Sequence, residues 1–436
     1  MQNPQGDDNR GESPPYTETR AAANPAAHDM SRPDPRFRGE GAAASVAGVI
    51  VATTLVQAFV SWAAVVLPSI APAFAQAFFL SPALIGFQVS LVYGGAILTS
   101  AFAGGMVRRY GACRTSQIAL VLSGLGCALI ALPTLIVLPL ASLSIGFGYG
   151  LTNPAAAHLI ARLGATRHRN ILFSAKQTGV PLGGVIAGML APPAAVAFGW
   201  QAAPLTAAAA CVVFGLALQP VRARWDSDRD RSAQIADRPF AGVTLVWGDT
   251  VLRRIALMSF CYSLAQVCLT TFLVTLLVEE ARFALVAAGF ALALVQAASV
   301  GGRLFWGWAA DRIGHGLALL AALGLMTALC SLAVAGLTQV LGAGLLVALF
   351  VVFGFAAVGW NGVYLAEVAR LAGAKAGEAT GGSLVVTFAG VLVGPALFSL
   401  IVEGIGGYAA AFAAVAAVAL IGVAFVRMAE PPRSPP

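Results

Sequence analysis

Long apolar stretches alternate with short polar ones over most of the chain. Most of them reach about 20 residues, the length that a helix needs to cross the hydrocarbon core of a bilayer. The pattern predicts an all-α membrane protein with twelve transmembrane helices. The expected helices span residues 45–75, 83–107, 115–132, 134–163, 171–196, 202–219, 253–278, 283–308, 316–337, 341–371, 380–403 and 407–427.

Polar stretches divide the chain into two predicted bundles of six helices, residues 44–219 and 253–428. Residues 1–43 carry few large apolar side chains, so we expect a disordered cytoplasmic tail with no cleavable signal peptide. Residues 220–252, which contain RARWDSDRDR, are expected to form a cytoplasmic linker. Residues 429–436 are expected to form a short cytoplasmic tail.

Composition supports the membrane class and charge fixes an orientation. The chain is 58% hydrophobic and 10% charged, and a mean hydropathy of +0.82 excludes an ordinary soluble core. Basic residues near helix ends stay in the cytoplasm, and one set of loops has only Arg282. Both termini are therefore expected in the cytoplasm of a bacterium, with the chain multi-pass in the inner membrane. The net charge of +7 needs no nucleic-acid partner. The other loops hold Arg108, Arg109, Arg114, Arg167, Arg169, Arg222, Arg224, Arg253, Arg254, Arg312 and Lys375.

The two predicted bundles repeat the same sequence marks. The stretch GFGYGLTNPAAAHLIARL at 146–163 aligns without a gap with GFAAVGWNGVYLAEVARL at 354–371, which places Asn153 opposite Asn361. Glycines spaced four apart, which let neighbouring helices approach closely, also recur in both halves. These glycines are Gly179, Gly183, Gly390 and Gly394. A parallel repeat of this kind indicates a substrate site between the halves, near the middle of the membrane.

A loop motif repeats as well, as GGMVRRYG from Gly104 and GWAADRIG from Gly307. The second copy resembles the G-x-x-x-D-R-x-G motif of the major facilitator superfamily, and this resemblance implies twelve helices and a cytoplasmic gate. In the first copy Arg108 stands where the acidic residue belongs. The expected gating residues are Gly104, Arg109, Gly111, Gly307, Asp311, Arg312 and Gly314.

Two cations are expected inside the membrane, Lys176 and Arg303, at similar depth in opposite halves. The acidic residues all fall near helix ends or outside the helices. The resemblance implies that helices five and eight face each other, where two unpaired cations would repel unless an anion lay between them. GRLFWGWAADR further resembles the monocarboxylate and oxalate/formate transporters, in which the arginine at the position of Arg303 faces a carboxylate. Alternatively, Lys176 extends to the lipid headgroups, and Arg303 joins Asp311 in the gate.

Other polar residues within helices are candidates for the same path. They could instead join helices by hydrogen bonds. The candidates are Gln57, Trp62, Asn153, Tyr262, Gln266, Trp360, Asn361 and Tyr364. His158 and Glu367 are candidates for proton coupling, although a packing role is also expected for the histidine.

These features predict a secondary transporter that moves a small organic anion by alternating access, coupled to protons or to counter-exchange. The alternatives are a drug or cation exporter, a transporter of neutral solutes, and a membrane sensor without transport. Enzyme signatures such as a P-loop, G-x-S-x-G or H-E-x-x-H are missing, so no enzymatic activity, cofactor or metal is expected. The expected partners are the solute and the lipid bilayer, and a monomer is compatible with the sequence.

Overall fold

The computed structural model describes residues 42–162, 172, 175–235 and 241–429, and these are almost entirely helical. The expected disorder of residues 1–43 concerns residues that lie almost wholly outside the described ones. The last two of them, Ala42 and Ala43, already belong to the first helix. The expected tail at 429–436 also lies outside the described residues, except for Ala429, which ends the last helix.

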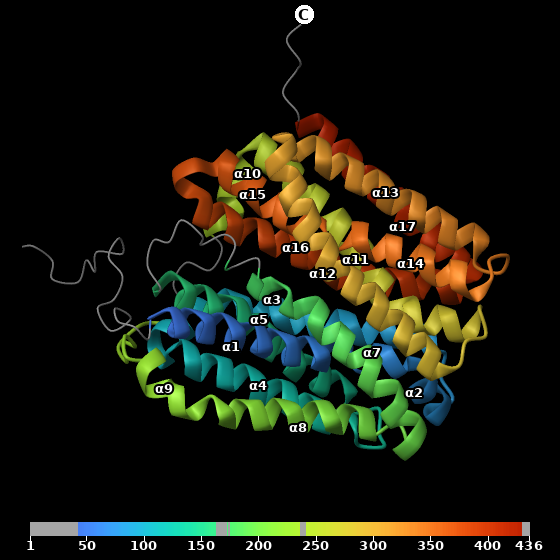
Figure 1. Ribbon diagram of the computed structural model, residues 1–436, viewed down its shortest axis with the longest axis horizontal. Coiled ribbons are helices and arrows are strands. Elements are labelled where there is room, and N and C mark those ends of the chain that lie inside the picture. The colour runs from blue at the N-terminus through green and yellow to red at the C-terminus, as the bar shows by residue number, and fades with distance from the viewer. Residues whose placement is uncertain (1–41, 163–171, 173–174, 236–240, 430–436) are drawn as a thin grey trace, which may run out of the picture.

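The long helices form two groups, which lie one above the other in Figure 1. The first group consists of α1 (Ala42–Val65), α3 (Ile85–Tyr110), α4 (Ala112–Ile130), α5 (Leu138–Arg162), α7 (Gly179–Phe198) and α8 (Ala202–Ala217). The second group consists of α11 (Thr250–Glu279), α12 (Leu285–Ile313), α13 (Gly316–Leu337), α14 (Ala343–Ala357), α15 (Trp360–Ala372), α16 (Ala376–Ile401) and α17 (Gly407–Ala429). Shorter elements are η2 (Pro68–Ile70), α2 (Ala71–Phe78), η3 (Pro82–Leu84), α9 (Gln219–Trp225), α10 (Ala241–Gly248), η4 (Gly373–Lys375) and η5 (Val402–Gly406).

Nine helices among the described residues are long and apolar enough to cross a membrane, or ten if α8 and α9, which meet at 52°, form one bent span. The count of twelve stays a prediction, since it also requires α5 to cross the membrane and α16 and α17 to cross it separately. α16 runs parallel to α11, because Thr387 contacts Ser259 and Phe398 stacks on Phe272 further along. α17 runs the opposite way, because Tyr408 at its start binds the last residue of α11.

Three expected segments are interrupted or contain extra helices. The first predicted helix, 45–75, ends early at Val65, and a 3-10 turn begins at Pro68, whose ring cannot continue an α-helix. The tenth, 341–371, consists of α14 and α15, which are separated at Val358 and Gly359. The linker is not wholly irregular either, since it contains most of α9 and all of α10.

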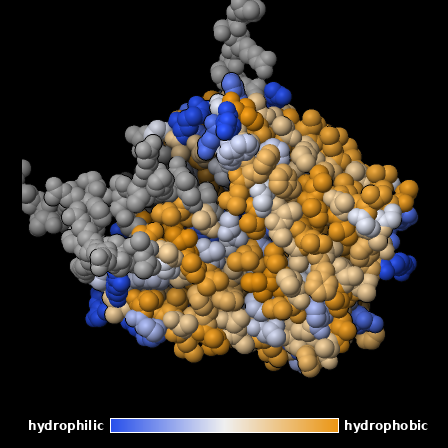
Figure 2. All heavy atoms as spheres, viewed as in Figure 1, coloured by the Kyte–Doolittle hydropathy of each residue, from blue (hydrophilic) through white to orange (hydrophobic). Residues whose placement is uncertain are grey.

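The surface is that of a protein surrounded by lipid. Hydrophobic residues dominate the face in Figure 2, and hydrophilic ones gather toward the two ends of the helices. Large apolar side chains on these outward faces include Leu98, 58% exposed, and Leu216, 69% exposed. α11 is the opposite case, because 83% of its most apolar window is buried inside the protein. The bundles therefore pack around central helices and present apolar side chains outward.

The two bundles touch through α7 against α12 and through α3 against α16. Gly188 packs on Gly289, where a side chain on either glycine would strike the backbone of the other helix. Near the same end, the Ser399 hydroxyl donates to the Ala83 carbonyl at 2.6 Å. The bundles converge at the end that carries α2 and diverge toward α9 and α10 (Figure 1).

Candidate functional site

Lys176 is fully buried, at the start of the helical segment that leads into α7. Its ammonium donates to three amide oxygens: Gln57 Oε1 at 2.8 Å, Asn153 Oδ1 and Gln177 Oε1 at 3.3 Å. Thr152 Oγ1 donates to the same Gln57 oxygen at 2.9 Å. Among the described residues, no carboxylate lies within hydrogen-bonding distance of this ammonium. The charge is therefore solvated by neutral dipoles and is not neutralised by an acid.

Close packing of α7 on α1 builds this arrangement. Gly179 lies directly against Gln57, and Gly183 lies against the backbone of α1 one turn further on. A larger residue at either position would push the two helices apart and move Gln57 from the ammonium. The glycine spacing recognised in the sequence thus helps to position the residues around the ammonium, which we name the lysine cage: Gln57, Thr152, Asn153 and Gln177.

Arg303 of α12 reaches the same place from the other bundle. One of its terminal nitrogens donates to the Gln177 backbone carbonyl at 3.0 Å, while its Nε is buried without a hydrogen-bond partner. Since the Gln177 side chain also accepts from Lys176, a single residue contacts both cations. The structure therefore brings Lys176 and Arg303 together across the contact between the bundles.

The two alternatives for these cations do not describe this structure. A lysine that extended to the headgroups would expose its ammonium, whereas Lys176 is 0% exposed. The ion pairs among the described residues do not include Arg303 with Asp311. Arg303 instead donates to Gln177.

Asn361 and Gln266 make the corresponding polar contact in the second bundle. Gln266 Oε1 accepts from Asn361 Nδ2 at 2.9 Å and from Trp360 Nε1 at 3.1 Å. Asn361 and Gln266 are partly exposed, whereas Trp360 is 1% exposed. The two amides thus hold α11 and α15 together without a charged group.

Three expected path residues lie inside a bundle. Tyr262 donates to the Leu320 carbonyl of α13 at 2.9 Å, so its hydroxyl points into the second bundle and does not join the group around Lys176. Tyr364 is 1% exposed and Trp62 is 4% exposed. Neither the Tyr364 hydroxyl nor the Trp62 indole nitrogen makes a hydrogen bond of normal geometry. The physical reason is that helices buried on most sides offer no single polar face that a sequence can reveal.

The second-half loop motif is open in this structure. Asp311 and Arg312 are exposed, and the Arg312 guanidinium lies 5.6 Å from the Trp308 ring centre. Among the described residues, the Asp311 carboxylate neither pairs with Arg312 nor accepts a hydrogen bond from a helix end. Gly314 has φ +68° at the end of α12, a conformation that favours glycine. Gly307 has open space around it.

The first-half loop motif receives its acid from the linker. Asp226 accepts from the backbone nitrogens of Cys113 at 2.7 Å and Arg114 at 3.1 Å, at the start of α4. Gly111, with φ +95°, faces this carboxylate so closely that a side chain would strike it. Burial raises the pKa of Asp226 above its ordinary value, against the lowering effect of these two hydrogen bonds. Asp226 therefore supplies a carboxylate to a loop that lacks one of its own, because Arg108 stands at the acidic position of the motif.

The remaining motif positions of the first loop make local contacts. Arg109 lies 5.9 Å from the ring centre of its neighbour Tyr110. Gly104 has open space around it, whereas Gly105 packs on the backbone of Ile235 in the linker. The sequence motif pointed to Gly104, and the structure shows that its neighbour makes the close approach.

Both candidates for proton coupling lie at helix ends. His158 Nε2 lies 2.7 Å from Asp228 Oδ2, and Arg162 donates to the other oxygen at 2.9 Å. Partial burial raises the pKa of Asp228, but His158 and Arg162 lower it further, so it lies below its ordinary value. Glu367 pairs with Arg370 at 2.6 Å beside the first turn of α13. Neither residue contacts Lys176.

Sequence reasoning missed the contacts that depend on the linker, and also Thr152 in the lysine cage. Asp226 lies 113 residues from Cys113, and no local pattern marks such a pair. The run of aspartates in RARWDSDRDR was the available signal, because three of them lie among arginines next to a helix end. Cys113 and the other five cysteines are buried and free, and no group of metal-binding side chains occurs among the described residues.

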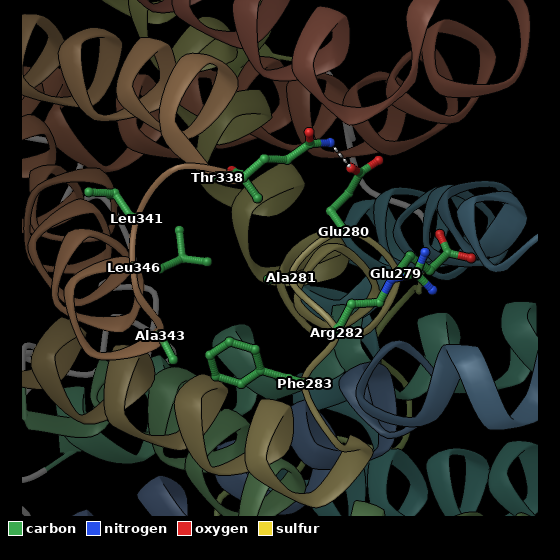
Figure 3. A pocket seen from close by; sticks show the side chains of 10 residues that line it. Glu279, Glu280, Ala281, Arg282, Phe283, Thr338, Leu341, Ala343 and Leu346 are labelled. Atoms are coloured by element: carbon green, nitrogen blue, oxygen red, sulfur yellow. Dashed lines mark hydrogen bonds between the residues drawn. The ribbon is translucent and has the colours of Figure 1, made fainter.

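Two cavities lie near the other end of the second bundle. The larger, about 420 Å³, is lined by residues at the end of α11 and the start of α14 (Figure 3). Phe283, Leu341 and Leu346 surround it, while the side chains of Glu279 and Arg282 point away. The second, about 360 Å³, adjoins it. Neither cavity includes a residue of the lysine cage, and the one basic residue in their linings, Arg282, points away from the larger cavity (Figure 3).

Comparison with known proteins identifies the family. A search of curated proteins finds no match to the chain. The family profile of the Major Facilitator Superfamily matches residues 50–382. This match covers more than half of the chain and includes both loop motifs, Lys176 and Arg303. With two helical bundles that meet through α7 and α12, the chain belongs to the Major Facilitator Superfamily of secondary membrane transporters.

Proposed function

We propose that the chain transports a small organic anion, which binds between the bundles at Lys176 and Arg303. The observation that carries the proposal is the fully buried ammonium of Lys176, held by neutral amides and joined through Gln177 to an arginine of the other bundle. Two adjacent buried cations are unfavourable without an opposite charge. A carboxylate of the solute would supply that charge and would bind Arg303 with directed hydrogen bonds.

Transport by alternating access follows from the position of this group. The solute would bind while the bundles diverge at the α9 and α10 end. As the other end opens, the contacts there between α7 and α12 would be replaced by contacts at the α9 and α10 end. Coupling to protons or to counter-exchange belongs to the same proposal. We place the chain in a bacterial inner membrane as a monomer, with both termini in the cytoplasm, from the distribution of arginine in the loops.

The rival transport functions have less support from the described residues. An exporter of cations needs an acid within its path, whereas Glu279, Glu280 and Glu403 lie at one end of the helices and Asp311 and Glu367 at the other. A neutral solute could use Asn153 and Gln57, but both amide oxygens are already bound to Lys176.

Uptake into proteoliposomes tests the proposal. The probes are labelled lactate and oxalate as anions, glucose as a neutral solute and tetraphenylphosphonium as a cation. Lys176→Gln should weaken uptake of the accepted anion about ten- to hundredfold in apparent affinity, as expected for the loss of a charge-assisted hydrogen bond. Lys375, the only other lysine, is exposed, so Lys375→Gln is the matched control and should behave like the parent. Uptake of only glucose or the phosphonium, or an unchanged affinity in Lys176→Gln, would reject the anion proposal.

A further inference from the structure

A second polar cluster lies inside the second bundle, where α11, α15 and α16 meet. It consists of the hydroxyl groups of Ser259, Tyr364, Ser383 and Thr387, each at most 6% exposed. Ser259 lies nine residues into α11, roughly 13 Å along the helix by its usual rise. The cluster is therefore well inside the helical bundle, and we name it the hydroxyl cluster.

Two hydroxyls of the cluster, those of Tyr364 and Ser383, make no hydrogen bond of normal geometry in the structure. Ser259 Oγ donates to the Ala256 carbonyl at 2.7 Å, and Thr387 Oγ1 donates to the Ser383 carbonyl at 3.0 Å. The two oxygens lie 2.8 Å apart, and either hydroxyl could instead donate its one proton to the other. The Tyr364 hydroxyl faces the hydroxyls of Ser259, Ser383 and Thr387, although its contacts with them are not hydrogen bonds of normal geometry.

The internal repeat relates this cluster to the lysine cage. Gly390 packs against Ser263 of α11 as Gly179 packs against Gln57 of α1. Thr387 precedes its glycine by three residues, as Lys176 does. The second half thus has a cluster of neutral oxygens at the position where the first half carries a covalently attached cation.

We propose that the hydroxyl cluster binds a sodium ion, which takes in the second half the position that the Lys176 ammonium has in the first. Hydroxyl and carbonyl oxygens are the ligands that hard cations prefer, and secondary transporters bind such ions within the membrane through backbone and side-chain oxygens. A divalent ion would need carboxylates to offset its charge, and none is in the cluster. The inference rests on the proposed function at one point only, where sodium takes the place of protons as the ion coupled to anion transport.

Thermal unfolding of the purified full-length chain tests the binding without a solute. Melting temperatures are compared at equal concentrations of sodium, potassium and choline chloride. Sodium at about ten times its dissociation constant should raise the melting temperature by about 1–2 °C over the other salts. Ser383→Ala should lose this response. Thr387→Lys places a covalently attached ammonium in the hydroxyl cluster, in the position proposed for sodium. This variant should therefore melt at the same temperature in all three salts.

Ser331 provides the control, because its hydroxyl is also fully buried and unpartnered, in α13. Ser331→Ala should keep the full sodium response. Equal melting of the parent in the three salts, or a sodium response that survives in Ser383→Ala, would overturn the sodium site and leave the cluster with bound water only. A sodium response without anion uptake would reject the proposed function alone, and anion uptake without a sodium response would reject this inference alone.

Discussion

The two bundles share one mode of close helix packing but have different polar residues beside it. In each, a helix with two glycines packs on the first helix of its half: α7 on α1 and α16 on α11. In the first bundle the residue three positions before the first glycine is Lys176, and the amides around it all accept hydrogen bonds. In the second bundle that residue is Thr387, and the amides of Gln266 and Asn361 bind each other. The repeat therefore preserves close contact between helices, while the polar residues beside that contact have diverged.

The largest expected effect concerns the glycines themselves. A side chain at Gly183 would strike the backbone of α1, whereas one at Gly394 would first meet the Leu264 side chain. Gly183→Ala should therefore destabilise the protein by about 1–3 kcal/mol, and Gly394→Ala by less, because a side chain can move aside. Melting temperatures and folded yield measure the difference. Gly362→Ala, which has open space, is the control, and an equal loss in all three variants would contradict the argument.

A smaller effect separates the two asparagines. Asn153→Asp places a carboxylate against the Lys176 ammonium, so it should keep the protein folded while lowering anion affinity about tenfold, since the internal acid competes with the solute. Asn361→Asp removes one donor to Gln266, which keeps its bond from Trp360, and should destabilise the protein by about 0.5–1.5 kcal/mol. Anion binding and thermal unfolding, measured on both variants, test this reversal. Loss of folding in Asn153→Asp with normal stability in Asn361→Asp would show that the amides have the opposite roles.

The smallest effect concerns the linker contact of the first bundle. The folded-state pKa of Asp228 is lowered, so the stability that it contributes is present above the unfolded value of about 3.9 and is lost as the pH falls through the folded value. Because the pair with His158 is about one-third exposed, Asp228→Asn should cost less than about 1 kcal/mol at pH 7. The difference in melting temperature between parent and variant should shrink as the pH falls below the unfolded value and disappear below the folded-state pKa of Asp228. A difference that grows in acid would contradict this sign.

Features that depend on local pattern were predictable from the sequence. The apolar stretches located the long helices, and the glycine spacing located the close contacts of α7 and α16. The burial of Lys176 was one of two alternatives that the sequence left open, the other being a lysine that extends to the lipid headgroups. The orientation of Tyr262 was not, since α11 is buried on most sides and its hydrophobic residues do not define one face.

Contacts made by distant segments escaped for a different reason. Asp226 and Asp228 follow α9, and only the folded chain brings them to the ends of α4 and α5. The hydroxyl cluster was missed because single serines and threonines in apolar helices usually bond their own backbone, as Ser259 does. Their convergence depends on how three helices are rotated, which hydrophobic periodicity does not specify in helices that are apolar all round.

The cap that Asp226 provides has a consequence for how the chain is made. Synthesis proceeds from the N-terminus, so the loop between α3 and α4 emerges from the ribosome while Asp226 has not yet been translated. During that interval no carboxylate of the linker lies beside this basic loop, and the first hairpins insert with its full positive charge. The carboxylate arrives after α9 and docks on a loop whose side of the membrane has already been chosen. Separating the two along the chain lets the same loop be strongly basic during insertion and capped by an acid after folding.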